Sequence, residues 1–405
     1  MNKKNNPFAS LFLFGAIVIQ PFALYADPMS MGALSHPTSA MNSNPLITPT
    51  PPNLNAKAFI LIDVNSGEIL AEKNSDEHLP PASLTKMMTL YVISNALHNE
   101  QIHLTDEVRI SQEAWKTAGS RMFVKEGQQV PIQDLLKGII VDSGNDACVA
   151  MAEHLGGSEA GFADIMNQQS KNIGMNNTHF TDSTGLPNPD LYTTAKDLAI
   201  LGTALIKNFP EYYHWYKQKW FTFNGIRQPN RNRLLWRDAQ VDGLKTGHTN
   251  DAGFCLVSSA KRDNMRLLAV VLGSPSETAR ADDSERLLNY GFRFFETHAL
   301  YKSGAIITQL PVYKGTINKL PIGLIEDENV TIPAGQYQRL TNDSNVPKYM
   351  QAPIKKGDKI GELIIKFDNV AIASRPLYAL ENAEKSGFFA RSKDSVKLLF
   401  NRWFG

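Results

Sequence analysis

The sequence has little cysteine and almost no net charge. Cys148 and Cys255 are its only cysteines, too few for a disulfide scaffold, so we expect either two buried hydrophobic side chains or a disulfide or reactive thiol. The 41 basic and 40 acidic residues leave a net charge of +1, which gives no global signal for nucleic-acid binding. The nine histidines form no zinc-spaced cluster or H-E-x-x-H motif, and no Gly-rich phosphate loop occurs. We therefore expect no metal, no cofactor and no nucleic-acid partner.

The most informative motif is Ser83-Leu-Thr-Lys86, which follows two prolines and opens an apolar run. On a helix, residues three apart share a face, so we expect the amine of Lys86 beside the hydroxyl of Ser83. A desolvated lysine among other cations can lose its proton and act as the base for a serine nucleophile. A chain of this length holds roughly one or two S-x-x-K strings by chance. The second string here, Ser258 to Lys261, lies in an apolar run typical of a strand, where such residues face opposite sides.

Two further motifs complete a catalytic set, Ser143-Gly-Asn145 and Lys245-Thr-Gly247. Together with S-x-x-K they are typical of penicillin-recognising serine enzymes. Both have decoys, such as Ser170-Lys-Asn172 and Lys302-Ser-Gly304, so order and spacing carry the inference. Ser143 follows Ser83 by 60 residues, and Lys245 follows Ser143 by 102.

The three motifs provide the groups that acyl transfer needs. We expect Ser83 to attack a carbonyl carbon and Lys86 to take its proton. Ser143 and Lys245 would pass a proton to the leaving nitrogen, and Asn145 would orient a peptide amide. Lys245-Thr-Gly247 directly precedes the strand expected at 254–260. The backbone N–H of Ser83 and one from the strand after this motif, with His248 as the candidate, are the expected oxyanion donors. Taken singly, each residue could be a helix cap, a turn residue or a solvated side chain, but their joint occurrence favours catalysis.

With these motifs the chain resembles the low-molecular-mass penicillin-binding proteins, the serine-type D-alanyl-D-alanine carboxypeptidases that trim peptidoglycan pentapeptides. Four further segments are similar to that family's own: residues 138–148, 223–228, 241–248 and 291–296. The resemblance covers about residues 55 to 300 and continues more loosely through the C-terminal part. It implies five catalytic residues: Ser83, Lys86, Ser143, Asn145 and Lys245.

The resemblance also implies contacts with the substrate. These fall on Thr246, Gly247, His248 and Arg280. Arg280 resembles the arginine that meets the terminal carboxylate of the substrate, and a guanidinium fork matches a carboxylate. The alternative is a surface arginine paired with Asp282 or Asp283. His179 and Asp197 are candidates for supporting the site from a distance.

One departure concerns β-lactam turnover. The middle motif is Ser-Gly-Asn rather than the Ser-Asp-Asn of class A β-lactamases, and the stretch Thr181–Asp190 has no glutamate to activate a deacylating water. We therefore expect β-lactams to acylate Ser83 covalently and to leave slowly.

Composition divides the chain into five segments. Two lysines, an apolar run over residues 8–19 and the segment Ala23-Leu-Tyr-Ala26 predict a signal peptide at 1–26. A retained anchor is the alternative, because Leu24 is bulky where a small residue is preferred. Residues 27–54 are rich in Pro, Ser, Thr and Asn, which predicts a disordered leader. We expect a catalytic domain at 55–298, a small β-domain at 299–383 and an amphipathic helix at 384–405. The signal peptide predicts export to the periplasmic face of the bacterial inner membrane.

The expected fold class is α/β (α+β), an antiparallel sheet with a helical insert, followed by a small all-β domain and a C-terminal amphipathic helix. A hairpin over residues 58–71 and a strand pair over 254–272 bracket helices expected at 83–97 and 195–207. From 300 to 380, short apolar runs are cut by Gly, Pro, Asn and Asp, which predicts the β-domain. Spacer and partner-binding roles for it both remain open.

The last segment is amphipathic. At about 100° per residue, Phe389, Val396, Phe400 and Trp403 fall on one side. From Lys385 onward there are five basic residues and one acidic residue. This pattern predicts an anchor lying in the plane of an anionic membrane surface. The alternative is a helix that packs on the β-domain.

The predicted function is a serine D-Ala-D-Ala carboxypeptidase that removes the terminal D-alanine of a peptidoglycan stem peptide through an acyl-serine intermediate. A D,D-endopeptidase or transpeptidase of the same superfamily is the enzymatic alternative, because either water or an amine can accept the acyl group. A non-catalytic peptidoglycan-binding or β-lactam-sensing protein is the alternative from another class.

Overall fold

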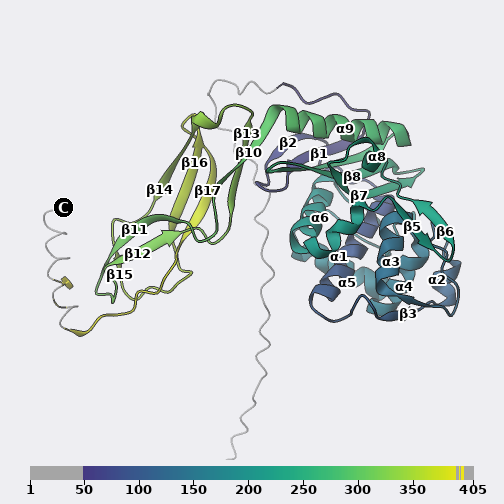
Figure 1. Ribbon diagram of the computed structural model, residues 1–405, viewed down its shortest axis with the longest axis horizontal. Coiled ribbons are helices and arrows are strands. Elements are labelled where there is room, and N and C mark those ends of the chain that lie inside the picture. Colours follow the sequence, from purple (N-terminus) through teal and green to yellow (C-terminus); the bar gives the residue numbers. More distant parts are fainter. Residues whose placement is uncertain (1–48, 389–391, 393, 396–405) are drawn as a thin grey trace, which may run out of the picture.

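The computed structural model describes residues 49–388, 392, 394 and 395 (Figure 1). The predicted signal peptide, residues 27–48 of the predicted leader and most of the predicted C-terminal helix lie outside the described residues. Within the described part, no helix combines the length and the apolar character needed to cross a bilayer.

The first domain is organised by a five-stranded antiparallel sheet. Its strand order is β2 (Ile69–Lys73), β1 (Ala58–Asp63), β9 (Met265–Ser274), β8 (Gly253–Arg262) and β7 (Val241–Thr249). Strand β1 pairs with β9, with Ile60 opposite Val270, so the N-terminal hairpin joins strands from far along the chain. The predicted hairpin and strand pair are both confirmed.

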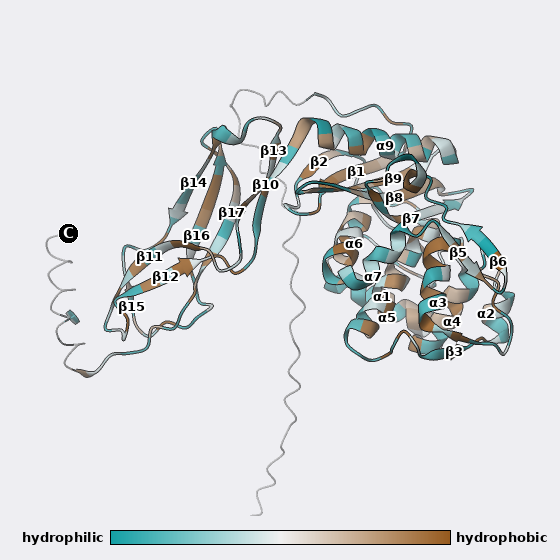
Figure 2. Ribbon diagram, in the orientation of Figure 1, coloured by the Kyte–Doolittle hydropathy of each residue, from teal (hydrophilic) through white to brown (hydrophobic). Residues whose placement is uncertain are grey.

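The sheet separates two hydrophobic cores because its side chains alternate between faces. On β1, Ile60 and Ile62 enter the core under the helices, whereas Phe59 and Leu61 enter the core under α9 (Glu277–Phe294). Strand β9 alternates in the same way. The domain therefore has three layers, and its hydrophobic residues concentrate where the strands lie between α9 and the helices (Figures 1 and 2).

Between β2 and β7 the chain forms the predicted helical insert. Its helices are η1 (Ala82–Thr85), α1 (Lys86–His98), α2 (Gln112–Lys116), α3 (Ile132–Lys137), η2 (Gly138–Asp142), α4 (Asn145–Gly156), α5 (Glu159–Asn172), α6 (Ala195–Asn208), α7 (Pro210–Tyr213), η3 (His214–Lys217) and α8 (Leu234–Arg237). Two short two-stranded sheets accompany them, β3 (Glu107–Arg109) with β4 (Gln129–Pro131) and the hairpin of β5 (Trp220–Phe223) with β6 (Ile226–Pro229). Both predicted helices are confirmed, although the first begins with a 3₁₀ turn.

The second domain consists of strands with a core of their own. Strand β10 (Phe295–Tyr301), which spans the predicted boundary at 298/299, pairs with β13 (Glu328–Pro333). A six-stranded sheet has the order β14 (Leu340–Asn345), β16 (Lys359–Phe367), β17 (Val370–Ala379), β12 (Lys319–Gly323), β11 (Ile306–Tyr313) and β15 (Met350–Gln351), with the 3₁₀ turn η4 (Tyr337–Arg339) before β14. Buried residues such as Leu320, Leu363 and Leu377 form its centre.

The two domains meet through hydrogen-bonding side chains. The hydroxyls of Ser66 and Thr331 lie 2.6 Å apart, and Thr297 donates to the buried carboxylate of Asp63. Asp63 also accepts the backbone N–H of Asn65 at 2.7 Å. Burial raises the pKa of Asp63, so these donors stabilise a carboxylate that the junction encloses.

Gly291 allows α9 to lie directly on the sheet. A Cβ atom there would be 2.5 Å from Leu267 Cδ1 and 3.0 Å from Leu61 Cδ2. We expect Gly291→Val to overpack this contact and to lower the free energy of unfolding by about 2 kcal/mol, measured by urea denaturation. Arg286→Val, at an exposed position of the same helix, is the matched control and should cost less than about 0.5 kcal/mol. Equal losses in the two variants would contradict the close-packing argument.

Candidate active site

Ser83 and Lys86 are brought together by the 3₁₀ turn that precedes α1. Side chains three apart eclipse one another in such a turn, and Lys86 Nζ lies 3.1 Å from Ser83 Oγ. The same nitrogen donates to the carbonyl oxygen of Thr184 at 2.6 Å. Ser83 is half-buried, whereas Lys86 is completely buried. The hydroxyl is therefore accessible while the amine beside it is enclosed.

The surroundings of Lys86 favour its neutral form. Burial lowers the pKa of the Lys86 amine, and the charge of Arg231 lowers it further, while Asp182 and Asp146 act in the opposite direction. Burial also raises the pKa of the adjacent Cys148 thiol to about 12, so this thiol is neutral at ordinary pH and provides no counter-charge. A buried lysine with a lowered pKa can accept the serine proton.

Ser143 and Lys245 form a second pair. Helix η2 ends at Ser143, whose backbone turns into the left-handed region at φ 58° and ψ 36°. Lys245 Nζ donates to Ser143 Oγ at 2.9 Å and to the Thr246 carbonyl at 3.0 Å. The pKa of Lys245 lies well below its usual value because of burial first, and then the positive charge of Lys86. The charge of Lys86 thus opposes the protonation of Lys245.

Asn145 begins α4 and faces the loop of residues 117–124. Its side-chain amide donates to the Ala118 carbonyl at 2.6 Å, and its Oδ1 has no hydrogen bond among the described residues. Gly119, at φ +90°, leaves room for this contact, because a Cβ atom there would be 2.6 Å from Asn145 Nδ2. The neighbouring Asp146 accepts the N–H groups of Met122 and Phe123, each at 2.9 Å. The loop is therefore held against the start of α4.

The third motif lies within an edge strand of its own. Sequence reasoning placed Lys245-Thr-Gly247 directly before the 254–260 strand, but the motif is part of β7, which pairs with β8 on one side only. A Cβ atom on Gly247 would be 2.8 Å from the Pro81 carbonyl oxygen and 3.2 Å from Leu84 N. Glycine at this position lets β7 lie against the 3₁₀ turn of Ser83, so the first and third motifs meet.

His248 and Arg280 lie at the end of the same motif. The His248 ring is exposed and stacks on Phe254 with the ring centroids 3.9 Å apart. Arg280, from the first turns of α9, donates to the Gly247 carbonyl at 3.1 Å and pairs with Glu277 at 3.4 Å. Its guanidinium is therefore anchored beside the motif.

The alternative interpretation of Arg280 as a surface residue is wrong. Arg280 is only 5% exposed. Asp282 pairs with Arg237 at 2.7 Å instead, and Asp283 accepts the Ser274 hydroxyl at 3.1 Å. Neither carboxylate competes for the arginine.

The stretch Thr181–Asp190 holds Lys86 through the Thr184 carbonyl. Asp182 Oδ1 accepts the N–H groups of Thr184 and Gly185 at 2.7 and 2.8 Å. A Cβ atom on Gly185 would be 1.9 Å from the Ala82 carbonyl oxygen, so this stretch packs against the turn that carries the nucleophile. The Asp182 carboxylate is therefore occupied by hydrogen bonds from the backbone of its own loop.

His179 and Asp197 stabilise the neighbouring backbone and form no hydrogen bond with the motif side chains within the described residues. His179 Nδ1 lies 2.8 Å from the Asp190 carbonyl. Asp197 accepts the Asn177 N–H at 2.8 Å and the Thr178 hydroxyl at 2.7 Å. Any effect of the two side chains on the site is therefore indirect.

The two cysteines are free and completely buried. Burial raises the pKa of Cys255 to about 11 and that of Cys148 to about 12, so neither is a reactive thiolate. The interpretation as small buried hydrophobic side chains is confirmed. The second S-x-x-K string, Ser258 to Lys261, does not form a serine–lysine pair, as expected. Ser258 is buried in β8 whereas Lys261 is exposed.

Sequence reasoning missed Asp142 and Arg231. Asp142 is 1% exposed, and neither carboxylate oxygen has a hydrogen-bond partner within the described residues. Burial raises its pKa to about 7, against the opposing charge of Arg231. Arg231 is exposed, and its charge lowers the pKa of both site lysines. For Arg231, the available signal in the sequence was the pair of asparagines that flank it, Asn230 and Asn232. They hold the turn that carries Arg231: Asn232 Nδ2, for example, donates to the Gly243 carbonyl at 2.9 Å.

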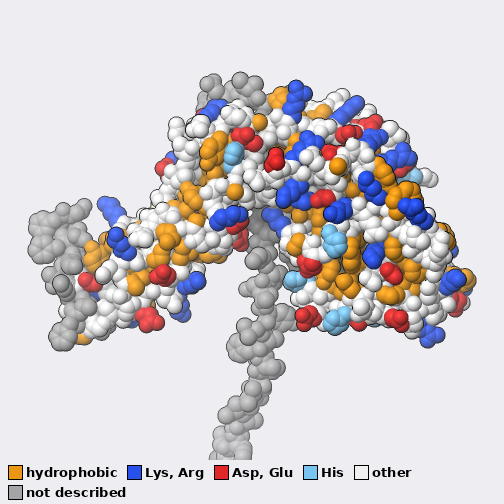
Figure 3. All heavy atoms as spheres, viewed as in Figure 1, with side chains coloured by type: hydrophobic (Ala, Val, Ile, Leu, Met, Phe, Trp, Pro, Cys, Tyr) orange, Lys and Arg blue, Asp and Glu red, His pale blue; other side chains and the backbone are white. Residues whose placement is uncertain are grey.

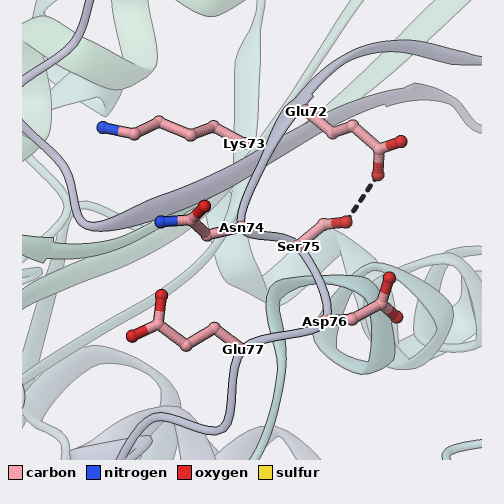
Figure 4. A pocket seen from close by; sticks show the side chains of 6 residues that line it. All are labelled: Glu72, Lys73, Asn74, Ser75, Asp76 and Glu77. Atoms are coloured by element: carbon pink, nitrogen blue, oxygen red, sulfur yellow. Dashed lines mark hydrogen bonds between the residues drawn. The ribbon is translucent and has the colours of Figure 1, made fainter.

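A hollow of about 440 Å³ lies at the end of β2, lined by residues 72–77 (Figure 4). Lys73, Asn74 and Glu77 point to one side of the chain, while Glu72 and Ser75 are hydrogen-bonded to each other on the opposite side. No motif residue lines this hollow. It is a surface feature separate from the catalytic groups.

Comparisons with known proteins agree with this arrangement. A family model described as "D-alanyl-D-alanine carboxypeptidase" matches residues 46–276, and one described as "Penicillin-binding protein 5, C-terminal domain" matches residues 295–385. The chain is 46% identical over 362 residues to the D-alanyl-D-alanine carboxypeptidase DacC of Escherichia coli (strain K12), covering 87% of this chain and 90% of that protein.

Solved structures show the same fold. Penicillin-binding protein 5 from Haemophilus influenzae matches with a TM-score of 0.80 and 43% identity, over 83% of this chain and 99% of that one. Penicillin-binding protein D2 from Listeria monocytogenes, in its ampicillin-bound form, matches with a TM-score of 0.55 and 32% identity, over 60% of this chain and 100% of that one. The predicted fold class is confirmed for the catalytic and β-domains, and the C-terminal helix stays a prediction.

The buried Asp142 carboxyl should make stability depend on pH. Its folded pKa of about 7 exceeds the ordinary aspartate value of 3.8, so the folded state binds the proton more tightly. Its contribution to stability is fully present below about pH 4 and is lost as pH rises through 7, by up to about 4 kcal/mol. Asp142→Asn, which cannot ionise, should remove this part of the slope in urea unfolding between pH 4 and 8. Parallel pH dependences of the wild type and the variant would contradict this assignment.

Proposed function

Because the chain belongs to the D-alanyl-D-alanine carboxypeptidase family of serine peptidases, we propose that it removes the terminal D-alanine from peptidoglycan stem peptides ending in D-Ala-D-Ala. One observation carries the proposal. A half-buried serine hydroxyl lies 3.1 Å from a completely buried lysine amine, next to a second lysine–serine pair at 2.9 Å. Such a cluster suits acyl transfer without a histidine or a metal.

In the proposed acylation step, Ser83 Oγ attacks the carbonyl carbon of the penultimate D-alanine and its proton passes to Lys86 Nζ. The carbon–nitrogen bond then breaks, and the leaving amine takes a proton delivered through Ser143 and Lys245. The products are an ester on Ser83 and free D-alanine. Removing one oxyanion donor, such as the N–H of Ser83, typically costs about 3 kcal/mol in the transition state.

In the proposed second step, a water molecule attacks the ester and releases the shortened peptide. Lys86, having passed the serine proton through Ser143 and Lys245 to the leaving amine, acts again as the base. It takes a proton from the attacking water and gives it to Ser83 Oγ as the ester bond breaks. A β-lactam would acylate the same serine and leave slowly, since the one carboxylate of the nearby Asp182–Gly185 turn is already hydrogen-bonded to its own backbone. β-Lactams are therefore proposed as covalent inhibitors.

Substrate selection is proposed to involve the end of β7 and the groups around it. Thr246, Gly247 and His248 would hold the peptide along the open edge of the strand, and Asn145 Oδ1 can accept an N–H from its backbone. Arg280 would add positive potential for the terminal carboxylate, because its guanidinium lies against the Gly247 carbonyl.

Export and attachment at the periplasmic face of the inner membrane are proposed from the sequence pattern of the two ends. The described start of the C-terminal segment touches the β-domain, since the Thr316 N–H donates to the Glu384 carbonyl at 2.8 Å and the Lys314 N–H donates to Asp394 at 2.7 Å. The amphipathic basic pattern that follows Lys385 suits an anionic surface. The β-domain would then connect the anchor and the catalytic domain.

Ser83→Ala tests the nucleophile. The wild type should bind a fluorescent penicillin covalently and convert a D-Ala-D-Ala pentapeptide, by addition of water, into a tetrapeptide and free D-alanine, as weighed by mass spectrometry. The variant should lose labelling and at least about a thousandfold of the turnover.

Ser258→Ala, in the second S-x-x-K string, is the matched control and should keep both activities. Labelling that survives Ser83→Ala would rule out this nucleophile. Transfer to an added amine in place of hydrolysis would favour the transpeptidase, and an inert wild type would favour the non-catalytic binding protein.

Truncation after Gly387 tests the anchor. It keeps the contacts of Glu384 and Ser386 with the β-domain and removes the amphipathic basic segment. The shortened protein should move from the membrane fraction to the soluble fraction while its pentapeptide turnover stays within about twofold of the full chain. Persistent membrane attachment would exclude this segment as the anchor.

A further inference from the structure

The hairpin β5–β6 and helix α8 carry a surface that the proposed chemistry does not use. Residues 212–237 contain six lysines and arginines, no aspartate or glutamate, and three of the five tryptophans of the chain. Arg233 and Arg237 pair with carboxylates of α9. The other four cations have no carboxylate partner within the described part of the chain.

The hairpin is amphipathic. Phe221 packs into the core beneath it, whereas Trp220, its neighbour in sequence, is 43% exposed. Trp220 pairs with Pro229 and Thr222 pairs with Arg227, so Trp220 and Arg227 share the outer face. Trp236 of α8, also 43% exposed, meets Trp220 edge to face with the ring centroids 6.1 Å apart.

Cations lie on the faces of both indoles. The Arg227 guanidinium is 4.4 Å from the Trp220 ring centre, and Lys219 Nζ is 5.9 Å from that of Trp236. We call these four residues, Lys219, Trp220, Arg227 and Trp236, the basic aromatic surface. A guanidinium resting on a ring keeps its N–H fork free for a carboxylate, and an exposed indole offers an apolar face with little conformational entropy to lose.

This surface is continuous with the proposed active site. From the inner side of β6, Gln228 donates to the Arg121 carbonyl at 2.8 Å, in the loop that Asn145 contacts. A few residues beyond β6 lies Arg231, whose charge reaches both site lysines. In the space-filling view, Lys and Arg side chains are interspersed with hydrophobic ones over this end of the molecule (Figure 3).

We propose that the basic aromatic surface binds the glycan strand of peptidoglycan together with its acidic stem peptides, so that the enzyme favours polymeric wall over free peptide. The proposal rests on the proposed function. Sugar rings present apolar C–H faces that stack on indoles, and stem peptides carry free carboxylates that match Arg227 and Lys219. A ligand with both features at once is the polymer that bears the proposed substrate.

An anionic membrane also suits tryptophan beside basic residues, but the arrangement of the molecule argues against it. Strands β5 and β6 lie at one end of the molecule, and β11, β12 and β15 of the β-domain lie toward the other end (Figure 1). Since the proposed anchor follows the β-domain, the basic aromatic surface faces away from the membrane.

The test compares Trp220→Ala and Arg227→Ala with the wild type on two substrates. With a soluble D-Ala-D-Ala pentapeptide, kcat and KM should stay within about twofold. With intact sacculi rich in pentapeptides, D-alanine release at low substrate should fall about tenfold through a higher KM, with kcat unchanged. The fraction of protein that sediments with sacculi should fall in parallel, and the Arg227 effect should shrink in high salt.

Arg293→Ala is the matched control, because Arg293 is an exposed cation stacked on Phe294 at 5.4 Å on another face of the domain. It should change neither substrate. Equal effects of the variants on peptide and sacculi, or no effect on sacculi, would overturn the proposal. So would a loss of binding to anionic phospholipid vesicles with sacculus binding intact. If the wild type releases no D-alanine from the pentapeptide, the proposed function fails, whereas sedimentation with sacculi still tests the surface.

Discussion

A lysine amine can take a proton from a serine hydroxyl only if holding that proton as an ammonium ion has become unfavourable, and burial creates this condition around Lys86. The amine is completely enclosed, with a carbonyl oxygen on one side and the serine on the other. The charge of Arg231 acts in the same direction. The two groups that this nitrogen contacts directly, a carbonyl and a hydroxyl, are uncharged, and the buried thiol of Cys148 stays protonated.

Assembling the site around the Lys86 amine requires the close approach of segments that are far apart in the sequence. Gly247 lets the edge strand touch the turn of the nucleophile, Gly185 lets the Thr184 loop pack on the same turn, and Gly119 leaves room for Asn145. A methyl group at any of these positions would meet another atom at less than 3 Å. The site is thus assembled by contacts between segments far apart in sequence, on the rigid support of a five-stranded sheet.

The arrangement also relates chemistry to the shape of the ligand. An edge strand with one side open can align an extended peptide through main-chain hydrogen bonds, while buried lysines act on its carbonyl carbon. The β-domain extends the molecule away from the catalytic groups (Figure 1). The basic aromatic surface, with Lys219 over Trp236 and Arg227 over Trp220, extends the positive potential beyond the catalytic groups. An enzyme that trims a polymer gains from such a surface because it need not rebind each stem peptide from solution.

Local pattern was enough to predict much of the structure. Short apolar runs on either side of turn residues predicted the hairpin of β1 and β2 and the pair of β8 and β9. Motif spacing and order predicted Ser83 with Lys86 and Ser143 with Lys245, because helix periodicity acts over a few residues. Only the tertiary structure placed the third motif in an edge strand and turned Arg280 inward. It also buried Asp142 with no hydrogen-bond partner among the described residues and brought the charge of Arg231 near the lysines. Those outcomes depend on which distant segments exclude water from a group, and desolvation has no signature in the residues that flank it.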